Sequence, residues 1–289
     1  MATETLTLGH IELIALLDGV EELGGPIEGQ FPAVPAEAML ESRQRWPSVH
    51  GQGGGWRLHV RSWLIRHPGG LVLVDTGVGR RGAPGPEWFG VEGALIDALH
   101  GVGTAPEHID TVVLTHVHDD HLGGSVTFDG DEPVPAFPRA RYLMQRADRE
   151  WQTSLARTDE DDARIDQLLL QPLERTGQLE LIDGEHDVAD GIHLLLASGH
   201  TPGHQIVRAG SAGATAIVTA DAFNHPLQVQ HPEWASVTDA DPDLAAATRR
   251  VLIDELVSHP GATVAPAHLP EAFGEIRPGH DGLATWVGR

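Results

Sequence analysis

Five short apolar runs in the sequence each end on an aspartate or a histidine. They are LVLVD ending at Asp75, TVVLTH at His116, LLLASGH at His200, AIVTAD at Asp221 and TVAPAH at His268. Short apolar runs with many β-branched residues indicate buried strands. Ligands of α/β proteins bind at the carboxyl ends of the strands. Five strand ends that carry such side chains therefore predict one shared site.

Helical patterns alternate with these strands, which predicts the α/β class. We expect a strand over residues 11–17 that ends at an Asp18-Gly19 turn, a hairpin over 58–77 and a strand over 140–145. Helices are expected over residues 91–100, 159–177 and 239–259, from apolar spacing and helix-stop signals. Glycines and prolines punctuate residues 22–57, which predicts a long loop with one short helix that lines the site. No linker or repeat interrupts the chain, so residues 1–289 are expected to form one domain.

Composition excludes several kinds of chemistry. The formal net charge is −23, and such a surface repels nucleic acids and anionic membranes. All 19 basic residues are arginines, so a lysine Schiff base is excluded. Cysteine is absent, which excludes disulfides, thiolate nucleophiles and cysteine zinc sites. The N-terminal residues lack the basic start of a signal peptide and no long apolar run follows, so we expect a cytoplasmic protein.

The stretch THVHDDHLGG, residues 115–124, concentrates candidate metal ligands. In extended backbone, the side chains of His116 and His118 fall on one face, and a turn then brings Asp120 and His121 round. Imidazole and carboxylate together suit Zn, Fe or Mn ions. Distant histidines and one distant aspartate add further ligands, which suggests two metals that share Asp221.

The HxHxDH run, followed in order by His200, Asp221 and His268, resembles the metallo-β-lactamase-fold hydrolases. The resemblance extends from the strand before Asp18-Gly19 to His268, and SGHTPGH around His200 matches a family motif. It implies an αββα sandwich with two divalent metal ions between the sheets. Zinc is expected, and Mn, Co or Fe fit the same ligands. The implied ligands are His116, His118 and His200 for one metal, Asp120, His121 and His268 for the other, and Asp221 as the bridge.

The resemblance also implies a mechanism. A bridging water or hydroxide is activated by the two cations, so no Ser, Cys or Lys nucleophile is needed. The second cation polarises the oxygen of the substrate. Asp120 then carries a proton to the leaving group. Asp75, in VDTG, matches an early family aspartate that supports the site, and we expect it to accept a hydrogen bond from a histidine ligand.

Within the family, the chain is most similar to quorum-quenching lactonases and methyl-parathion-hydrolase-like phosphotriesterases. A hydrolase that opens lactones or cleaves small neutral esters is therefore expected, and the lactonase resemblance suggests a homodimer. A phosphotriesterase or aryl-ester hydrolase with the same site is the main alternative. An iron-dependent oxygenase and a non-catalytic metal-binding protein are further alternatives.

One departure from the lactonases concerns the residue three positions after the bridging aspartate. Many lactonases have a tyrosine there that touches the substrate carbonyl, whereas this chain has Asn224. The single tyrosine, Tyr142, belongs to a predicted strand, so Asn224 or His225 is expected to make that catalytic contact. The predicted pocket residues are Phe223, Asn224, His225, Trp56 and Trp88. Two further expectations are a surface position for the pair Arg249-Arg250 and a solvated face for the acidic run that begins at Asp159.

Overall fold

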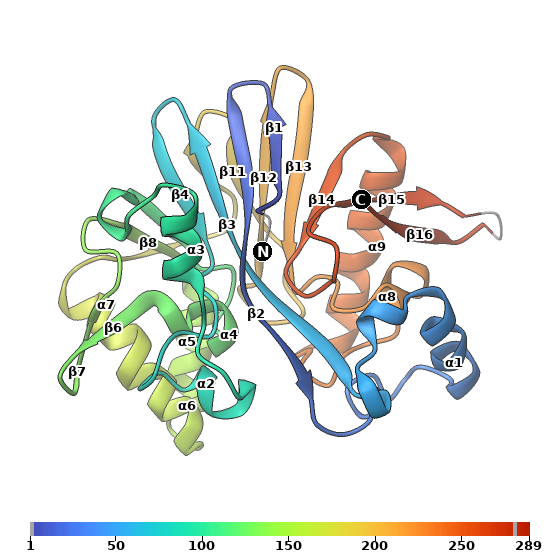
Figure 1. The fold of residues 1–289 in the computed structure, drawn as a ribbon, viewed down its shortest axis with the longest axis horizontal. Helices are drawn as coiled ribbons and strands as arrows, with labels where there is room; N and C mark the ends of the chain where they lie inside the picture. Colours follow the sequence, from blue (N-terminus) through green and yellow to red (C-terminus); the bar gives the residue numbers. More distant parts are fainter. Residues whose placement is uncertain (1–2, 280–281) are drawn as a thin grey trace.

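The computed structural model describes residues 3–279 and 282–289. Two seven-stranded sheets form the centre of the molecule (Figure 1). The first has the order β1 (Thr5–Leu8), β2 (Ile11–Leu23), β3 (Trp56–His67), β4 (Gly70–Val74), β5 (Thr111–Val113), β8 (Arg141–Gln145) and β9 (Leu179–Ile182). The second has the order β10 (His186–Ala189), β11 (Ile192–Leu196), β12 (Gln205–Ser211), β13 (Ala214–Ala220), β14 (Thr263–Pro266), β15 (Gly274–Pro278) and β16 (Ala284–Gly288).

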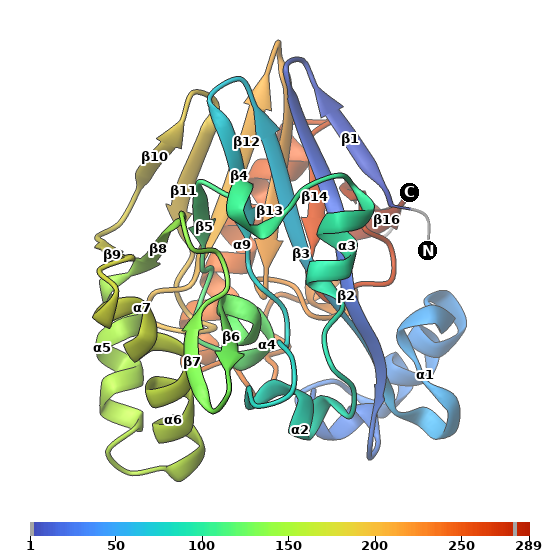
Figure 2. The same ribbon diagram turned by 60° about the vertical axis from the view of Figure 1, so that its left-hand side comes forward.

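Helices cover the outer face of each sheet, so the chain has the αββα arrangement that the family resemblance implied (Figures 1 and 2). The helices are α1 (Ala36–Arg45), α2 (Gly85–Phe89), α3 (Leu95–Gly101), α4 (Asp119–Leu122), α5 (Arg146–Leu155), α6 (Glu160–Ile165), α7 (Gln171–Arg175), α8 (Leu227–Gln230) and α9 (Pro242–Ser258). A small hairpin of β6 (Val126–Asp129) and β7 (Glu132–Pro135) lies outside the two sheets. In the described ranges, no helix combines the length and the apolar character needed to cross a membrane.

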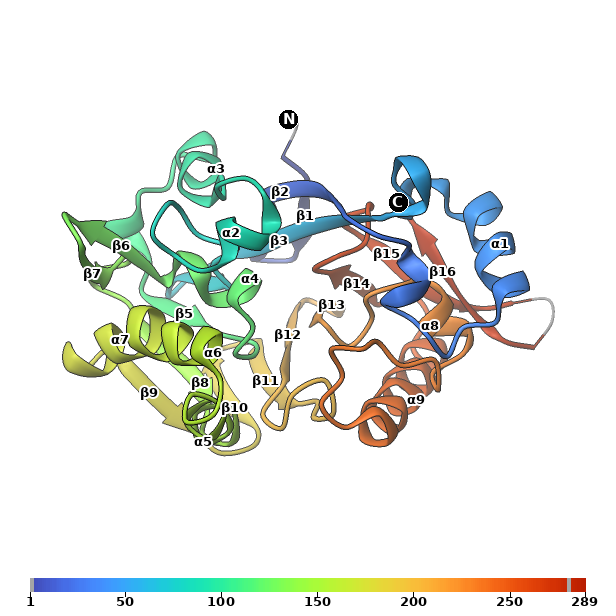
Figure 3. The same ribbon diagram turned by 90° about the horizontal axis from the view of Figure 1, so that it is seen from below.

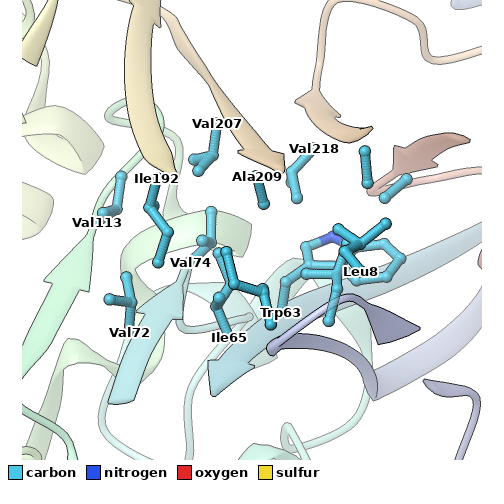
Figure 4. Close-up of a cluster of buried hydrophobic side chains, with 14 of the residues drawn as sticks. Leu8, Trp63, Ile65, Val72, Val74, Val113, Ile192, Val207, Ala209 and Val218 are labelled. Atoms are coloured by element: carbon cyan, nitrogen blue, oxygen red, sulfur yellow. The ribbon is translucent and has the colours of Figure 1, made fainter. Parts of the chain in front are cut away.

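Alternating side chains of the strands build the core between the sheets. Trp63 and Ile65 of β3 point inward, whereas Leu64 between them packs under the outer helices. Figure 4 shows inward-pointing residues such as Val74 of the first sheet opposite Val207 of the second. A separate core joins the second sheet to α9, through residues that include Leu252 and Leu256. Burial of these faces is the main stabilising contribution to the sandwich.

The strand predicted over residues 11–17 is longer than expected. It continues to Leu23 as β2, and its pairing with β3 shifts register between Leu17 and Gly19. The expected Asp18-Gly19 turn is therefore wrong, because Asp18 occupies a β-bulge. The bulge buries the Asp18 carboxylate, which accepts hydrogen bonds of 2.8 Å from the backbone amides of Val78 and Leu95.

The helix predictions hold with three differences. The helix expected over residues 91–100 begins only at Leu95, and the helix expected over residues 239–259 begins only at Pro242. The helix expected over residues 159–177 is interrupted by a π-helical stretch, Asp166–Leu170, between α6 and α7. Pro172 lies in the first turn of α7, where a proline needs no backbone N–H partner. The Asp159 side chain caps α6 by accepting from the amides of Asp161 and Asp162, as acids before a helix do.

The N-terminal segment, which we define as residues 24–55, connects β2 to β3. It holds α1 and three 3-10 turns, η1 (Ile27–Gly29), η2 (Pro47–Val49) and η3 (Gln52–Gly54). Its apolar residues, among them Phe31 and Met39, form a cluster with the ends of β2 and β3. The one short helix expected here is α1. The single-domain assignment of residues 1–289 stays a prediction.

Candidate metal centre

The five predicted strand ends meet at one end of the sandwich (Figure 3). His116 and His118 lie on the loop after β5, and Asp120 and His121 lie on the short helix α4. His200 lies on the loop between β11 and β12. Asp221 directly follows β13, and His268 follows β14. The structure therefore brings all seven sequence-predicted ligands together.

The first group of ligands comprises His116, His118, His200 and Asp221. Their ligand atoms lie within 4.8 Å of one another. His118 Nδ1 is 3.1 Å from His116 Nε2 and 3.0 Å from His200 Nε2. His116 is fully buried, so its ring nitrogen is held away from bulk water.

The second group comprises Asp120, His121 and His268, whose ligand atoms also lie within 4.8 Å of one another. The Nε2 atoms of His121 and His268 are 3.1 Å apart. An Asp120 carboxylate oxygen is 3.7 Å from His121 Nε2 and 3.5 Å from His268 Nε2.

Asp221 lies between the two groups and directs one oxygen to each. Its Oδ1 is 3.0 Å from His121 Nε2 and 3.1 Å from His268 Nε2. Its Oδ2 is 3.3 Å from His200 Nε2. A carboxylate in this position is suited to bridge two cations. The residue before it, Ala220, has a φ of 42°, a strained conformation for a residue with a side chain.

The partners of the other ring nitrogens test whether this donor set fits metal ions. His121 Nδ1 donates to Asp75 Oδ2 at 2.7 Å, and His268 Nδ1 donates to the His59 carbonyl oxygen at 2.7 Å. Both protons are therefore assigned to Nδ1, and both Nε2 lone pairs face each other across 3.1 Å. Two buried lone pairs at this distance repel each other unless a proton or a metal ion lies against them. The residues fit the two divalent ions expected from the sequence.

Asp75 occupies the position predicted for it. One carboxylate oxygen accepts from the Thr115 backbone amide, and the other accepts from both the Thr115 hydroxyl and His121. The Thr115 hydroxyl is in turn 3.1 Å from His116 Nδ1, which leaves His116 Nε2 free to face the centre. Asp75 therefore orients two candidate ligands, one directly and one through Thr115.

His200 and Asp221 are held by Asp239, Arg249 and His204, to which the sequence assigned no role in the site. Asp239 Oδ1 accepts from His200 Nδ1 at 3.0 Å, and its Oδ2 contacts Arg249 Nη1 at 3.2 Å. Arg249 is 1% exposed, so its expected surface position is wrong. His204 Nδ1 donates to the Ala197 carbonyl, and its Nε2 accepts from the Asp221 backbone amide at 3.2 Å. These contacts surround the ligands with fixed hydrogen-bond partners.

The pKa values reflect the concentration of carboxylates around the second group. Burial disfavours a charge on His121, but the carboxylates of Asp221, Asp120 and Asp75 outweigh burial and raise its pKa well above the usual range. Burial and the neighbouring His200 lower the pKa of His118 to about 3, although Asp120 and Asp221 act in the opposite direction. Positive charge is therefore favoured beside Asp221, where a cation would also be stabilised.

A cavity of about 480 Å³ opens over the two groups. His118, Asp120, Asp221 and His268 reach it, together with Asn224. Its apolar lining consists of Leu23, Trp56, Leu58, Trp88, Val117, Trp151, Leu155 and Ile165. The described lining residues include no arginine or lysine. This volume is in the range of small-molecule sites.

The predicted pocket residues divide into two sets. Trp56, Trp88 and Asn224 line the cavity as expected, and Trp88 Nε1 donates to Asp119 at 2.8 Å. Phe223 and His225 were expected there, but neither is among the described lining residues. Phe223 is buried in the core against α9. His225 packs on the N-terminal segment, with its ring centroid 5.4 Å from that of Phe31.

Two further expectations about the pocket are settled by burial. Tyr142 is fully buried in its strand, and its hydroxyl donates to the Ser125 carbonyl, so it is not available to a substrate. The acidic run that begins at Asp159 is exposed through Asp161, as expected, whereas Asp162 is half-buried, lines the cavity and accepts from Gln152. Helix α5 contributes Trp151 and Leu155, which the sequence analysis did not assign to the pocket.

Comparison with known proteins identifies relatives by sequence. An N-acyl homoserine lactonase from Bacillus cereus is 26% identical over 185 residues, which are 60% of this chain and 66% of that protein. The N-acyl homoserine lactonase AttM from Rhizobium radiobacter is 26% identical over 195 residues, which are 58% of this chain and 68% of that protein. The chain thus matches about two thirds of the length of these relatives.

Solved structures share the fold over almost the whole chain. Hydrolase AbOPH of the beta lactamase superfamily has a TM-score of 0.84 at 23% identity, covering 99% of this chain and 97% of that one. AidC, a dizinc quorum-quenching lactonase, has a TM-score of 0.83 at 22% identity, covering 100% of this chain and 97% of that one. The model of the metallo-beta-lactamase superfamily matches residues 55–268. The resemblance inferred from the sequence is thereby confirmed, and the chain belongs to the metallo-β-lactamase superfamily.

Proposed function

We propose that this protein is a dinuclear metal-dependent hydrolase that opens lactones. The observation that carries the proposal is the convergence of six candidate ligands around a seventh, Asp221, at the floor of a mainly apolar cavity. The relatives named as N-acyl homoserine lactonases support the choice of substrate. The Zn²⁺ expected from the sequence suits this set of imidazoles and carboxylates.

His116, His118 and His200 would hold one cation, Asp120, His121 and His268 the other, and Asp221 both. When bound, the cations supply a water of lowered pKa as the nucleophile and a Lewis acid for the carbonyl oxygen. The protein residues that line the cavity position the lactone above this floor. The apolar wall of Trp88, Trp151 and Leu155 excludes water around the substrate.

Ring opening adds water across the ester bond. The water oxygen bonds to the carbonyl carbon, the bond to the ring oxygen breaks, and the product is a hydroxy acid. Asp120 reaches the cavity and would carry the proton from the water to the departing ring oxygen. Asn224 lies in the same lining and would hydrogen-bond the carbonyl oxygen, the contact that a tyrosine makes in many lactonases.

The charge of the cavity favours neutral substrates. Asp119, Asp120, Asp162 and Asp221 line it, and no arginine or lysine of the described residues offsets them there. Two bound divalent cations would offset these four carboxylates, so the loaded lining would carry little net charge and would suit an uncharged lactone.

The test is hydrolysis of an N-acyl homoserine lactone, followed in a pH-stat with protein whose metal content is measured by elemental analysis. We expect about two metal ions per chain and opening of the lactone ring. Chelation should remove the metal ions and abolish the ring opening. The variant His118→Ala should lose bound metal and ring-opening activity. The variant His186→Ala, which removes a histidine outside the site, should keep both the metal and the activity. Two metals without ring opening would overturn the lactonase proposal, and faster cleavage of a paraoxon-type triester would then favour the phosphotriesterase alternative. The homodimer and the cytoplasmic location stay predictions.

A further inference from the structure

The two groups of candidate ligands differ in the charges that lie behind them. His121 donates to Asp75, whose carboxylate accepts otherwise only from the Thr115 amide and hydroxyl, among the partners that the structure describes. His200 donates to Asp239, whose carboxylate is paired with the Arg249 guanidinium. One histidine is thus supported by an unneutralised carboxylate, and the other by a carboxylate that an arginine neutralises.

The Asp239–Arg249 pair is deeply buried, since both side chains are 1% exposed. Arg249 Nη1 is 3.2 Å from Asp239 Oδ2, and Nε donates to the Pro232 carbonyl at 2.8 Å. The Ser236 amide also donates to Asp239 Oδ2, at 3.0 Å. These contacts fix the second oxygen of Asp239, so that Oδ1 faces His200. Screening by water is weak at such a site, so both charges act on His200 and on what it binds.

We propose that Asp239 and Arg249 are positioning residues that act in opposite directions on the cation held by His116, His118 and His200. Asp239 holds His200 with its Nε2 lone pair toward the centre and adds negative charge. Arg249 holds Asp239 in place and offsets that charge. This group therefore binds its cation more weakly than the group of Asp120, His121 and His268. The inference rests on the proposed binding of two divalent cations.

The charges around the second group strengthen this difference. Asp120 belongs to that group, and Asp75 lies behind it, whereas the first group has Asp221 as its carboxylate ligand, shared with the second. Attraction for a divalent cation rises with the number of nearby unneutralised carboxylates. On partial chelation we therefore expect the first group to lose its ion before the second.

The experiment is a titration of metal-free protein with Zn²⁺ in competition with a chromophoric chelator. The wild type should bind two ions with distinct affinities. Asp239→Asn should weaken the weaker site by about 10–100-fold, the usual effect of removing such a partner. Arg249→Gln should tighten the same site by about tenfold, because the Asp239 charge is then no longer offset. The control Arg250→Gln removes the same charge from the neighbouring exposed position and should change neither affinity.

Opposite changes of Zn²⁺ affinity in Asp239→Asn and Arg249→Gln distinguish this role from a purely structural one. In a purely structural role, both variants would weaken Zn²⁺ binding. Because an unpaired buried charge destabilises the fold, the double variant Asp239→Asn/Arg249→Gln is the second measurement. It removes both charges, and its affinity should lie between those of the two single variants. Weakening by both single variants, or two equal sites in the wild type, would overturn the inference. Failure of the wild type to bind any Zn²⁺ would instead overturn the proposed function.

Discussion

Two clusters of histidines in this molecule differ in their chemistry. The candidate metal centre combines five histidines with Asp120 and Asp221. The second cluster comprises Ser42 of α1, His50 and His225, where Ser42 Oγ is 2.7 Å from His50 Nε2 and 3.3 Å from His225 Nε2. His225 Nδ1 accepts from the Leu227 amide, so its proton is on Nε2 and points to the serine. The first cluster directs lone pairs to a common point, and the second uses them in hydrogen bonds.

The carboxylates explain the difference between the clusters. Around the metal centre they raise the pKa of His121 and of His268, despite the burial of both rings. No carboxylate contact of His225 occurs in the described part of the chain, and burial followed by His50 lowers its pKa to about 3. A buried imidazole without an acid beside it stays neutral and serves packing. The carboxylates beside a buried ring therefore distinguish His121 and His268 from His225.

The largest effect is expected where the two groups of ligands share a residue. Asp221→Asn removes the charge that faces both groups, so we expect at most one metal ion per chain and at least about a 100-fold loss of lactone hydrolysis. Metal analysis and pH-stat rates test this. Asp187→Asn is the matched control, because Asp187 pairs with His193 in an exposed histidine–aspartate contact. An Asp221→Asn protein with full metal content would refute the bridging role.

The next effect concerns the pH dependence of stability. It arises in the cluster of Ser42, His50 and His225, which we call the neutral cluster. Because the pKa of His225 is lowered from 6.5 to about 3 in the folded protein, the unfolded chain binds its proton first as the pH falls. The stability that neutral His225 contributes is therefore full above pH 6.5 and declines toward pH 3. Between pH 6.5 and about 4.5 this loss amounts to about 2 kcal/mol.

Urea unfolding of the wild type and of His225→Gln across this pH range isolates the effect. The free energy of unfolding of the variant should lack this part of the decline with falling pH. The difference in unfolding free energy between the two proteins should therefore narrow at low pH. The control is His259→Gln, since His259 is exposed at the end of α9. Parallel curves for the wild type and His225→Gln would show that His225 is protonated in the fold.

A smaller effect is expected from the serine that joins the neutral cluster. Ser42→Ala leaves the facing nitrogens of His50 and His225 without their shared partner, which should cost about 1–2 kcal/mol of stability. Metal content should not change. Ser258→Ala, at an exposed position, should leave both stability and metal content unchanged. Loss of metal from Ser42→Ala would show that the two clusters are coupled rather than separate.

The sequence predicts the first cluster well and the second poorly, for a physical reason. His116, His118 and Asp120 are close in sequence, and the other ligands follow recognisable strands, so local patterns suffice. His225 meets Ser42 through a contact between residues 183 positions apart, which no local pattern encodes. Its nearness in sequence to Asp221 suggested the cavity, but the chain turns into α8 and directs it to the N-terminal segment.

Arg249 illustrates a signal that the sequence contained. The buried residues of α9 are Ala245, Ala246, Arg249, Leu252, Ile253 and Leu256. They follow helical spacing, so Arg249 falls on the apolar face and Arg250 beside it does not. A charged residue on such a face requires a buried partner. Asp239, which meets that requirement, lies in a loop, and so the pairing itself required the structure.

Asn224 lies between Asp221 and His225 in the chain, and it provides the smallest predicted effect. Its backbone amide and that of His225 both donate to Gln228, which fixes the turn. Its side chain is buried and lines the cavity with Asp221, and its Oδ1 has no hydrogen-bond partner among the described residues. The Nδ2 group of the same side chain is the donor that would contact the substrate carbonyl oxygen.

We therefore expect Asn224→Ala to lower kcat/KM for the lactone by about five- to tenfold, a loss of about 1 kcal/mol of transition-state stabilisation. Thermal stability and metal content should stay at the wild-type values, because no side-chain hydrogen bond of the described fold is lost. Gln30→Ala is the matched control, as it removes another carboxamide from the same lining, away from Asp221 in the chain. If Asn224→Ala loses metal instead, the residue supports the centre. If Gln30→Ala shows the larger loss, the substrate carbonyl binds nearer to the N-terminal segment than to Asn224.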